Sequence, residues 1–352
     1  MKILDWYIAR VLLGSSALCL LVLTGLSSII KWVDQLRLVG RGSYSMFDAA
    51  MYVVYLIPRD IELFFPMAVL LGALIGMGML ASNSELVVMQ ASGMSRFQIA
   101  LSAMKTAVPL MLMIMVLGEW GAPAAEMKAK ELRATKVSGG NLIKAHRGVW
   151  ARDGNMFINI GRIESIDHLA DVTLYGFDDN LHLQYVIHAK DAYYDNNAWN
   201  LQQTQRSAIE QDQVVIEQQP TQRWESTLTP DKLSVVSIKP DALSIQGLVD
   251  YIDYLASNNQ DSSRYQLAFW HKLIQPLTVA VMMLVALSFV FGPLRSQTMG
   301  ARIVLGVISG FVFYICNEIF GPLTLVYELP AFFGAIMPSV LFTGAALYYI
   351  RK

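Results

Sequence analysis

The sequence predicts an α-helical membrane protein with an inserted all-β domain: three membrane-spanning helices, a β-jelly roll, then three more helices. Of its 352 residues, 54% are hydrophobic and only 16% are charged, against roughly 25% charged in an ordinary soluble domain. The apolar residues gather in long runs toward both ends, and the middle alternates short strands with turn residues. We therefore expect helices in 1–125, the β domain with a return helix in 126–265, and helices in 266–352.

Six apolar runs are long enough to be spans. A helix needs about 20 apolar residues to cross a hydrocarbon core about 30 Å thick. The second run is too long for one straight crossing, so Pro58 and Pro66 are expected to kink or divide it and to leave Asp60 and Glu62 near the interface. The runs are 11–30, 49–81, 106–120 (with Lys105 reaching toward the surface), 273–291, 303–326 and 331–350.

The insert is predicted to be antiparallel β structure. Its short segments are rich in β-branched and aromatic residues and partly alternate in polarity. Asp, Asn and Gly separate them at 153–155, 178–180 and 195–197, which is typical of turns. A short amphipathic helix is expected at 244–256. The strands are expected at 156–160, 172–177, 181–187, 199–209, 214–218 and 222–228, enough for a sandwich or jelly roll.

The distribution of Lys and Arg predicts the orientation. Short cytoplasmic loops collect basic residues, so the side holding most of them is assigned to the cytoplasm together with both termini. The β domain then lies outside, in the periplasm of a Gram-negative cell. The cytoplasmic set is Lys2, Arg10, Arg96, Lys105, Arg295, Arg302, Arg351 and Lys352, and the opposite short loops hold Arg37 and Arg41.

Several function classes are disfavoured by what the sequence lacks. A net charge of −1 gives no reason to expect a nucleic-acid partner. The chain contains no Walker-type phosphate loop and no Gly-x-Ser-x-Gly elbow, and its five histidines show no metal-ligand spacing. Cys19 and Cys316 lie in apolar runs and are expected to be small buried hydrophobes. We expect no catalytic residue, no metal site, no cofactor and no enzyme activity in this chain.

The connection at 81–96 is the most informative segment. Ser82 or Ser84 can cap a short helix carrying Leu86 and Met89, and Gly93 can end it. Such a helix at a cytoplasmic surface can dock into a groove of an ATPase subunit. The same spacing is also explained by a tight interhelical connection whose polar residues serve only to keep it solvated.

The run Ser84-Glu85-Leu86-Val87-Val88-Met89-Gln90-Ala91-Ser92-Gly93 resembles the coupling-helix signature of the lipopolysaccharide export permeases, the YjgP/YjgQ family. Segments 30–36, 228–233, 275–283 and 320–327 are similar to the LptG-type subunits of that family, and the resemblance is weakest in the β insert.

The resemblance implies a permease subunit of an ABC-type exporter in the Gram-negative inner membrane. Such a subunit extracts lipopolysaccharide from the inner membrane and passes it to a periplasmic bridge toward the outer membrane. The implied partners are a cytoplasmic ATPase dimer (LptB-type), which hydrolyses the ATP, a second permease subunit (LptF-type), a single-span bridge subunit (LptC-type) and a periplasmic bridge protein (LptA-type). Glu85 matches the acidic coupling residue, and the expected coupling set is Glu85, Leu86, Met89 and Arg96.

A phosphate-bearing lipid needs apolar walls and a few cations near the periplasmic interface. The candidates are Lys31, Arg37, Arg41 and Arg133. Basic residues also anchor helices at headgroups without binding a substrate, so both interpretations stay open, as do the roles of Glu119 and Glu318. A non-transporting scaffold that recruits periplasmic partners is the alternative function. A secondary transporter is disfavoured, because the spans show no inverted repeat or midplane ion cluster.

Overall fold

The computed structural model describes residues 3–138, 149–165, 167–210, 213–226, 228–230, 240–291 and 298–351. The chain forms two compact units. The helical unit consists of Met1–Val33, Val54–Ala125 and Ser263–Lys352, and the second unit consists of Asp34–Val53 and Glu126–Ser262. Some residues used in the sequence argument lie outside the described ranges: Lys2, Arg295 and Lys352 of the basic set, His146, and 231–233 of one family segment.

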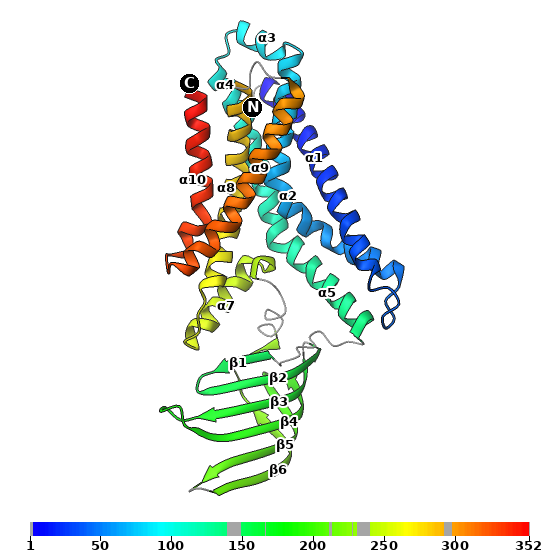
Figure 1. Cartoon of the computed structure of the whole chain (residues 1–352), viewed down its shortest axis with the longest axis vertical. Coiled ribbons are helices and arrows are strands. Elements are labelled where there is room, and N and C mark those ends of the chain that lie inside the picture. The colour runs from blue at the N-terminus through cyan, green and yellow to red at the C-terminus, as the bar shows by residue number, and fades with distance from the viewer. Residues whose placement is uncertain are drawn as a thin grey trace. The chain divides into compact units, whose positions relative to one another are not determined.

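Within the described residues, six helical stretches are long and apolar enough to cross a membrane, which confirms the predicted number and order of spans. Figure 1 shows them as the long coiled ribbons. They are α1 (Ile3–Leu36), α2 (Met46–Ser82), a stretch formed by α4 (Arg96–Val116), η1 (Leu117–Gly121) and α5 (Ala122–Ser138), and then α8 (Ser263–Phe291), α9 (Met299–Val326) and α10 (Ala331–Arg351).

The second and third stretches show which expected breaks occur. Pro58 and Pro66 both lie inside α2, a single helix of 37 residues, so they do not divide it. The carbonyls freed by a proline can find other partners inside a bundle. The third stretch does not end at residue 120. It passes through the π-helical turn η1 and continues as α5. Single π turns of this kind are frequent at functional sites.

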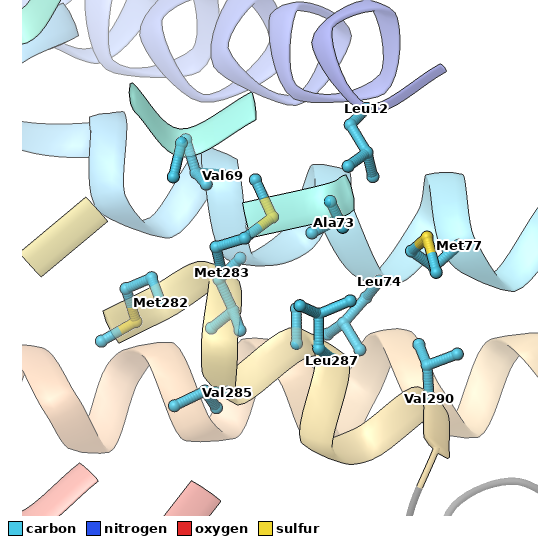
Figure 2. Packing of buried hydrophobic residues seen from close by; sticks show 14 of the residues in the cluster. Leu12, Val69, Ala73, Leu74, Met77, Met282, Met283, Val285, Leu287 and Val290 are labelled. Carbon is cyan, nitrogen blue, oxygen red and sulfur yellow. The ribbon is translucent and has the colours of Figure 1, made fainter. Parts of the chain in front are cut away.

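The core of the helical unit lies around α2 and α8. In the most apolar 18-residue stretch of each helix, 67% of the residues are buried in α2 and 61% in α8, against 17% in each of α1 and α9. Leu74 of α2 and Leu287 of α8 are fully buried, and Figure 2 shows their side chains pointing toward one another. The contact is made by apolar side chains filling the space between helices, as in other close-packed interiors.

Small residues bring α1 against α2. A Cβ added at Gly72 would lie 2.3 Å from the Ser16 Cα atom, so only glycine permits this approach. The Ser15 hydroxyl donates a hydrogen bond of 2.6 Å to the Gly72 carbonyl. Close approach through small residues, with a hydroxyl joining the two helices, is typical of packing in membranes.

The second unit contains a six-stranded antiparallel sheet with the strand order β1-β2-β3-β4-β5-β6, which confirms the inserted β domain. Each strand pairs with its chain neighbours, so the described strands form a meander in one sheet, whereas a jelly roll has two sheets joined by Greek-key connections. The strands are β1 (Val149–Asp153), β2 (Met156–Ser165), β3 (His168–Phe177), β4 (Leu183–Asp195), β5 (Ala198–Glu210) and β6 (Gln213–Trp224).

Turn residues set the register of these hairpins. Asp195 pairs with Ala198, so β4 and β5 are joined by two residues, Asn196 and Asn197. Both have positive φ, 50° and 60°, which a two-residue type I′ hairpin requires and which asparagine tolerates. The predicted turn at 195–197 is therefore confirmed.

The expected amphipathic helix is α7 (Ile245–Ser257), which follows the 3₁₀ turn η2 (Pro240–Ala242). The Ser244 hydroxyl caps it by accepting a hydrogen bond of 3.0 Å from the Gly247 N–H. The Tyr254 hydroxyl donates to the Arg152 carbonyl at 2.9 Å, which fastens α7 to β1. Burial, with a smaller effect of the Asp153 carboxylate, raises the pKa of Tyr254 to about 12, so its hydroxyl stays a donor at any physiological pH.

Candidate functional site

The connection between the second and third spans contains a short helix, α3 (Glu85–Ala91). The predicted serine cap is wrong: Ser84 lies in the left-handed region at φ 61° and makes no side-chain cap bond. Gly93 ends the helix as predicted, at φ 96°. Its N–H donates to the Gln90 carbonyl and the Met94 N–H to the Met89 carbonyl, at 3.1 and 3.2 Å, which is the Schellman arrangement.

The faces of α3 are not those expected. Leu86 and Met89 were expected on the docking surface, but they are 5% and 7% exposed and pack into the core of the helical unit. Val87 and Val88 are the large apolar side chains that α3 exposes. Residues three apart share a helix face, and because both faces of α3 are apolar the sequence did not reveal which one turns inward.

Glu85 begins α3 and has a partner that the sequence analysis did not identify. It accepts a hydrogen bond of 2.7 Å from the hydroxyl of Tyr7, on α1. Arg96 is exposed at the first residue of α4. A capping box of Ser95 and Gln98, with hydrogen bonds of 3.0 and 3.2 Å, fixes the start of that helix. The segment thus presents an acidic residue, Glu85, and a basic residue, Arg96, and the exposed Val87 and Val88 lie between them in the sequence.

The four cations expected to bind lipid are divided between the two units. Lys31 belongs to the helical unit, where its amine pairs with the Asp60 carboxylate of α2. The other three, Arg37, Arg41 and Arg133, belong to the second unit and are exposed. The Arg133 guanidinium lies 5.8 Å from the ring centroid of Tyr52, close enough for a cation–π contact.

Asp60 and Glu62, expected near the interface, are both buried inside the helical unit. Their exposed fractions are 1% and 2%. Glu62 pairs with Arg59 at 2.8 Å and with Lys272 of α8 at 3.7 Å. Charged residues inside a span are costly, which makes each a candidate for a functional site. The sequence shows the acidic residues of α2 and a Lys at the start of the fourth apolar run. That these residues contact one another depends on how the helices pack, which the sequence does not show.

Space for Glu62 comes from the π turn. A Cβ added at Gly118 of η1 would lie 2.9 Å from Glu62 Oε1, and the Gln275 side-chain amide donates to the Glu62 carbonyl at 3.2 Å. The carboxylate is therefore enclosed by three segments that are distant in the sequence.

A second buried carboxylate, Asp5, joins α1 to α4. It accepts hydrogen bonds from the Ser102 hydroxyl and from Lys105, the latter at 3.0 Å. The Lys105 side chain is half-exposed while it pairs with Asp5, and its reach to the membrane surface stays a prediction. Glu119 is half-buried and Glu318 is exposed. Cys19 and Cys316 are free and only partly buried.

Within the part of the chain that the structure describes, no group of three or more His, Cys, Asp or Glu is placed to hold a metal ion. The buried acidic groups instead face Lys, Arg and Ser side chains. This chemistry favours charge pairing within the chain.

Comparison with known proteins places these features in a family. Residues 6–352 match the family described as lipopolysaccharide export system permease LptF/LptG. The chain is 49% identical to the lipopolysaccharide export system permease protein LptG of Escherichia coli K12, over 99% of this chain and 98% of that protein. It is also 49% identical to LptG of Haemophilus influenzae, over 96% of this chain and 95% of that protein.

Proposed function

Because the chain belongs to the lipopolysaccharide export system permease LptF/LptG family, we propose that it extracts lipopolysaccharide from the inner membrane and passes it to a periplasmic bridge. The chain is a permease subunit of the lipopolysaccharide export system, and it is a multi-pass protein of the Gram-negative inner membrane. It is not an enzyme in itself. The observation that carries the proposal is the end-to-end similarity to LptG together with six spans and a β insert.

The proposed energy source is a separate LptB-type ATPase dimer on the cytoplasmic side. The segment around α3 supports this assignment, since it offers Glu85 and Arg96 as charges and Val87 and Val88 as exposed apolar contacts. Leu86 and Met89 anchor α3 to the bundle, so a push on α3 is transmitted directly to the core packed beneath it.

The proposed lipid path uses the cations at the outer ends of the spans. Lys31, Arg37, Arg41 and Arg133 would meet the phosphates of lipid A, because phosphate pairs with Lys and Arg are charge-assisted. An LptF-type subunit would complete the membrane cavity. The β domain would lie in the periplasm, beside the LptC-type and LptA-type proteins that continue the bridge, with both termini of the chain in the cytoplasm.

Coupling is tested with Glu85→Arg in the assembled exporter. Loss of one partner of an interfacial charge pair commonly costs about 2–5 kcal/mol, so co-purified ATPase and lipid-stimulated hydrolysis should fall by more than tenfold. Asn83→Arg is the matched control, because Asn83 is an exposed neighbour in the same connection. Tyr7→Phe removes the hydrogen bond within the chain but keeps the Glu85 charge, and it should retain the ATPase. Full coupling in Glu85→Arg would refute the assignment.

Lipid binding is tested by the amount of lipopolysaccharide that co-purifies per mole of folded complex. Lys31→Ala should lower it, and Lys31→Glu should lower it further, since reversal adds repulsion. The double variant Lys31→Glu/Arg37→Glu should retain least. If that variant keeps full occupancy, these cations are only headgroup anchors.

A further inference from the structure

Helix α2 carries two buried carboxylates whose cationic partners differ in exposure. Asp60 pairs with Lys31 of α1, whose side chain is 34% exposed, and Glu62 pairs with Lys272 of α8, whose side chain is 6% exposed. All four residues belong to the helical unit. The two pairs lie two residues apart on one helix, so they are a matched set for comparison.

The Glu62 pair is enclosed. Arg59 adds a second cation at 2.8 Å, and Gly118 leaves room for the carboxylate where any side chain would collide with it. An ion that approached Lys272 from outside would have to displace this packing. Separating this pair would leave both a carboxylate and an amine buried away from water, which is costly, so the Glu62 pair is fixed.

The Asp60 pair is open on one side. The carboxylate is buried, at 1% exposed, but the lysine side chain that neutralises it is 34% exposed. A lysine carries a compact charge on a flexible stem, and its amine can turn between partners without moving the helix. Asp60 also accepts a hydrogen bond of 3.1 Å from the Ser27 hydroxyl, which remains when the amine leaves.

We propose that Asp60 is a positioning residue that competes with the substrate phosphate for Lys31. The inference rests on the proposed function of Lys31 as a lipid cation and extends it. With the cavity empty, Asp60 holds the Lys31 amine against α2. A lipid phosphate draws the amine away, and Asp60 takes it back when the lipid moves on. The competition keeps the phosphate contact weak enough for release.

The physical basis is the exchange of one anionic partner for another. Lys31 is charge-compensated in both states, so neither state leaves it bare. Asp60 loses its cation in the lipid-bound state and keeps only the Ser27 hydroxyl among the partners described here. A buried carboxylate with fewer partners is disfavoured, and that cost lowers the affinity for the lipid. Removing the carboxylate should therefore increase retention of the lipid and slow its release.

The experiment uses the assembled exporter in lipid nanodiscs loaded with lipopolysaccharide, with lipid per mole of folded complex measured before and after ATP. Asp60→Asn should raise the lipid retained by about two- to fivefold, the range for a partly exposed ion pair, and should slow ATP-driven release. Lys31→Ala should lower retention, and Asp60→Asn should have no further effect in that background. Glu62→Gln is the matched control, and it should lower thermal stability without raising retention.

Ser27→Ala is a second variant that keeps every charge. It removes the hydrogen bond that stabilises Asp60 after the amine has left, so retention should fall, opposite to the effect of Asp60→Asn. If Asp60→Asn does not fold, a decrease in Ser27→Ala supports the inference, and an unchanged or higher retention overturns it.

The outcomes separate the inference from the function on which it rests. If Lys31→Ala retains as much lipid as the unaltered protein, the proposed lipid cation fails. If Lys31→Ala loses lipid and Asp60→Asn does not gain it, the competition is refuted and the cation stands. A gain in Asp60→Asn that persists in the Lys31→Ala background also refutes it, because the effect would not pass through Lys31.

Discussion

The helical unit and the β sheet place their apolar side chains in opposite ways. Along α1, Leu21, Leu26 and Ile29 are 68%, 58% and 61% exposed. Along β3, the alternate residues Val172 and Leu174 are buried at 0% and 1%. The helix presents its apolar surface outward, whereas the strand turns it to the inner face.

Charged groups show the reverse arrangement. In the helical unit the carboxylates of Asp60 and Glu62 are inside. The second unit has an ion pair on its surface, Arg223 with Glu225, whose side chains are 61% and 81% exposed. Lipid solvates apolar side chains and gives polar groups no partner, so polar groups turn inward in the helical unit. Water imposes the opposite arrangement on the sheet.

The largest loss of stability is expected when the buried pair of Glu62 and Lys272 is broken. Lys272→Met removes the interhelical cation of Glu62 and leaves Arg59 as its charged partner. Breaking a buried pair on one side costs about 3–5 kcal/mol, and the remaining Arg59 pair offsets part of this. The thermal unfolding midpoint in nanodiscs should fall strongly. Adding Glu62→Gln should recover most of the loss, since neither residue then carries a charge. A double variant as unstable as Lys272→Met would show that the pair is not what the site requires.

A smaller effect should separate inner from outer leucines of the helical unit. Leu74→Ala opens a cavity between α2 and α8. A lipid-solvated chain lacks most of the transfer contribution found in water, so we expect on the order of 1–3 kcal/mol from lost packing contacts. Leu21→Ala on the exposed side of α1 should change the midpoint little. Equal losses in the two variants would contradict the assignment of inside and outside.

In the sheet, Trp199 tests the water-solvated core. It is fully buried, and its indole N–H donates to the Leu228 carbonyl at 2.8 Å. Trp199→Phe leaves that carbonyl without this donor, which costs about 1–3 kcal/mol. Hydrogen exchange of β5 and β6 should become faster. The control is Trp150→Phe, because Trp150 is 59% exposed, and a similar change there would show that burial is not the cause.

The smallest effect is expected at the turn between β3 and β4. The Asp178 carboxylate accepts hydrogen bonds from the backbone N–H groups of His182 and Asn180. These bonds, that of His182 most, hold the pKa of Asp178 below its ordinary value. A carboxylate whose pKa is lower in the folded state than in the unfolded state stabilises the fold at pH values above its unfolded pKa. This contribution is lost as the pH falls through the folded-state pKa. Asp178→Asn should remove this part of the acid sensitivity, seen as a flatter unfolding midpoint below about pH 4. An unchanged profile would refute the assignment.

The sequence by itself determined the spans and the insert. Long apolar runs are sufficient to define membrane helices because each such helix satisfies its own backbone hydrogen bonds. The hairpin at Asn196 and Asn197 was predictable for a similarly local reason, since asparagine tolerates positive φ. Gly93 as the end of α3 belongs to the same class.

Only the tertiary structure decided which polar groups meet. The two buried ion pairs join three helices: Asp60 pairs with Lys31 of α1, and Glu62 pairs with Lys272 of α8. Local helix propensity does not predict which of these helices each carboxylate faces. The inward turn of Leu86 and Met89 was undecidable for the same reason: α3 is apolar on both faces, and the packing beneath it selects one. Side-chain pairing across helices depends on how whole helices pack, and that information is distributed over the entire chain.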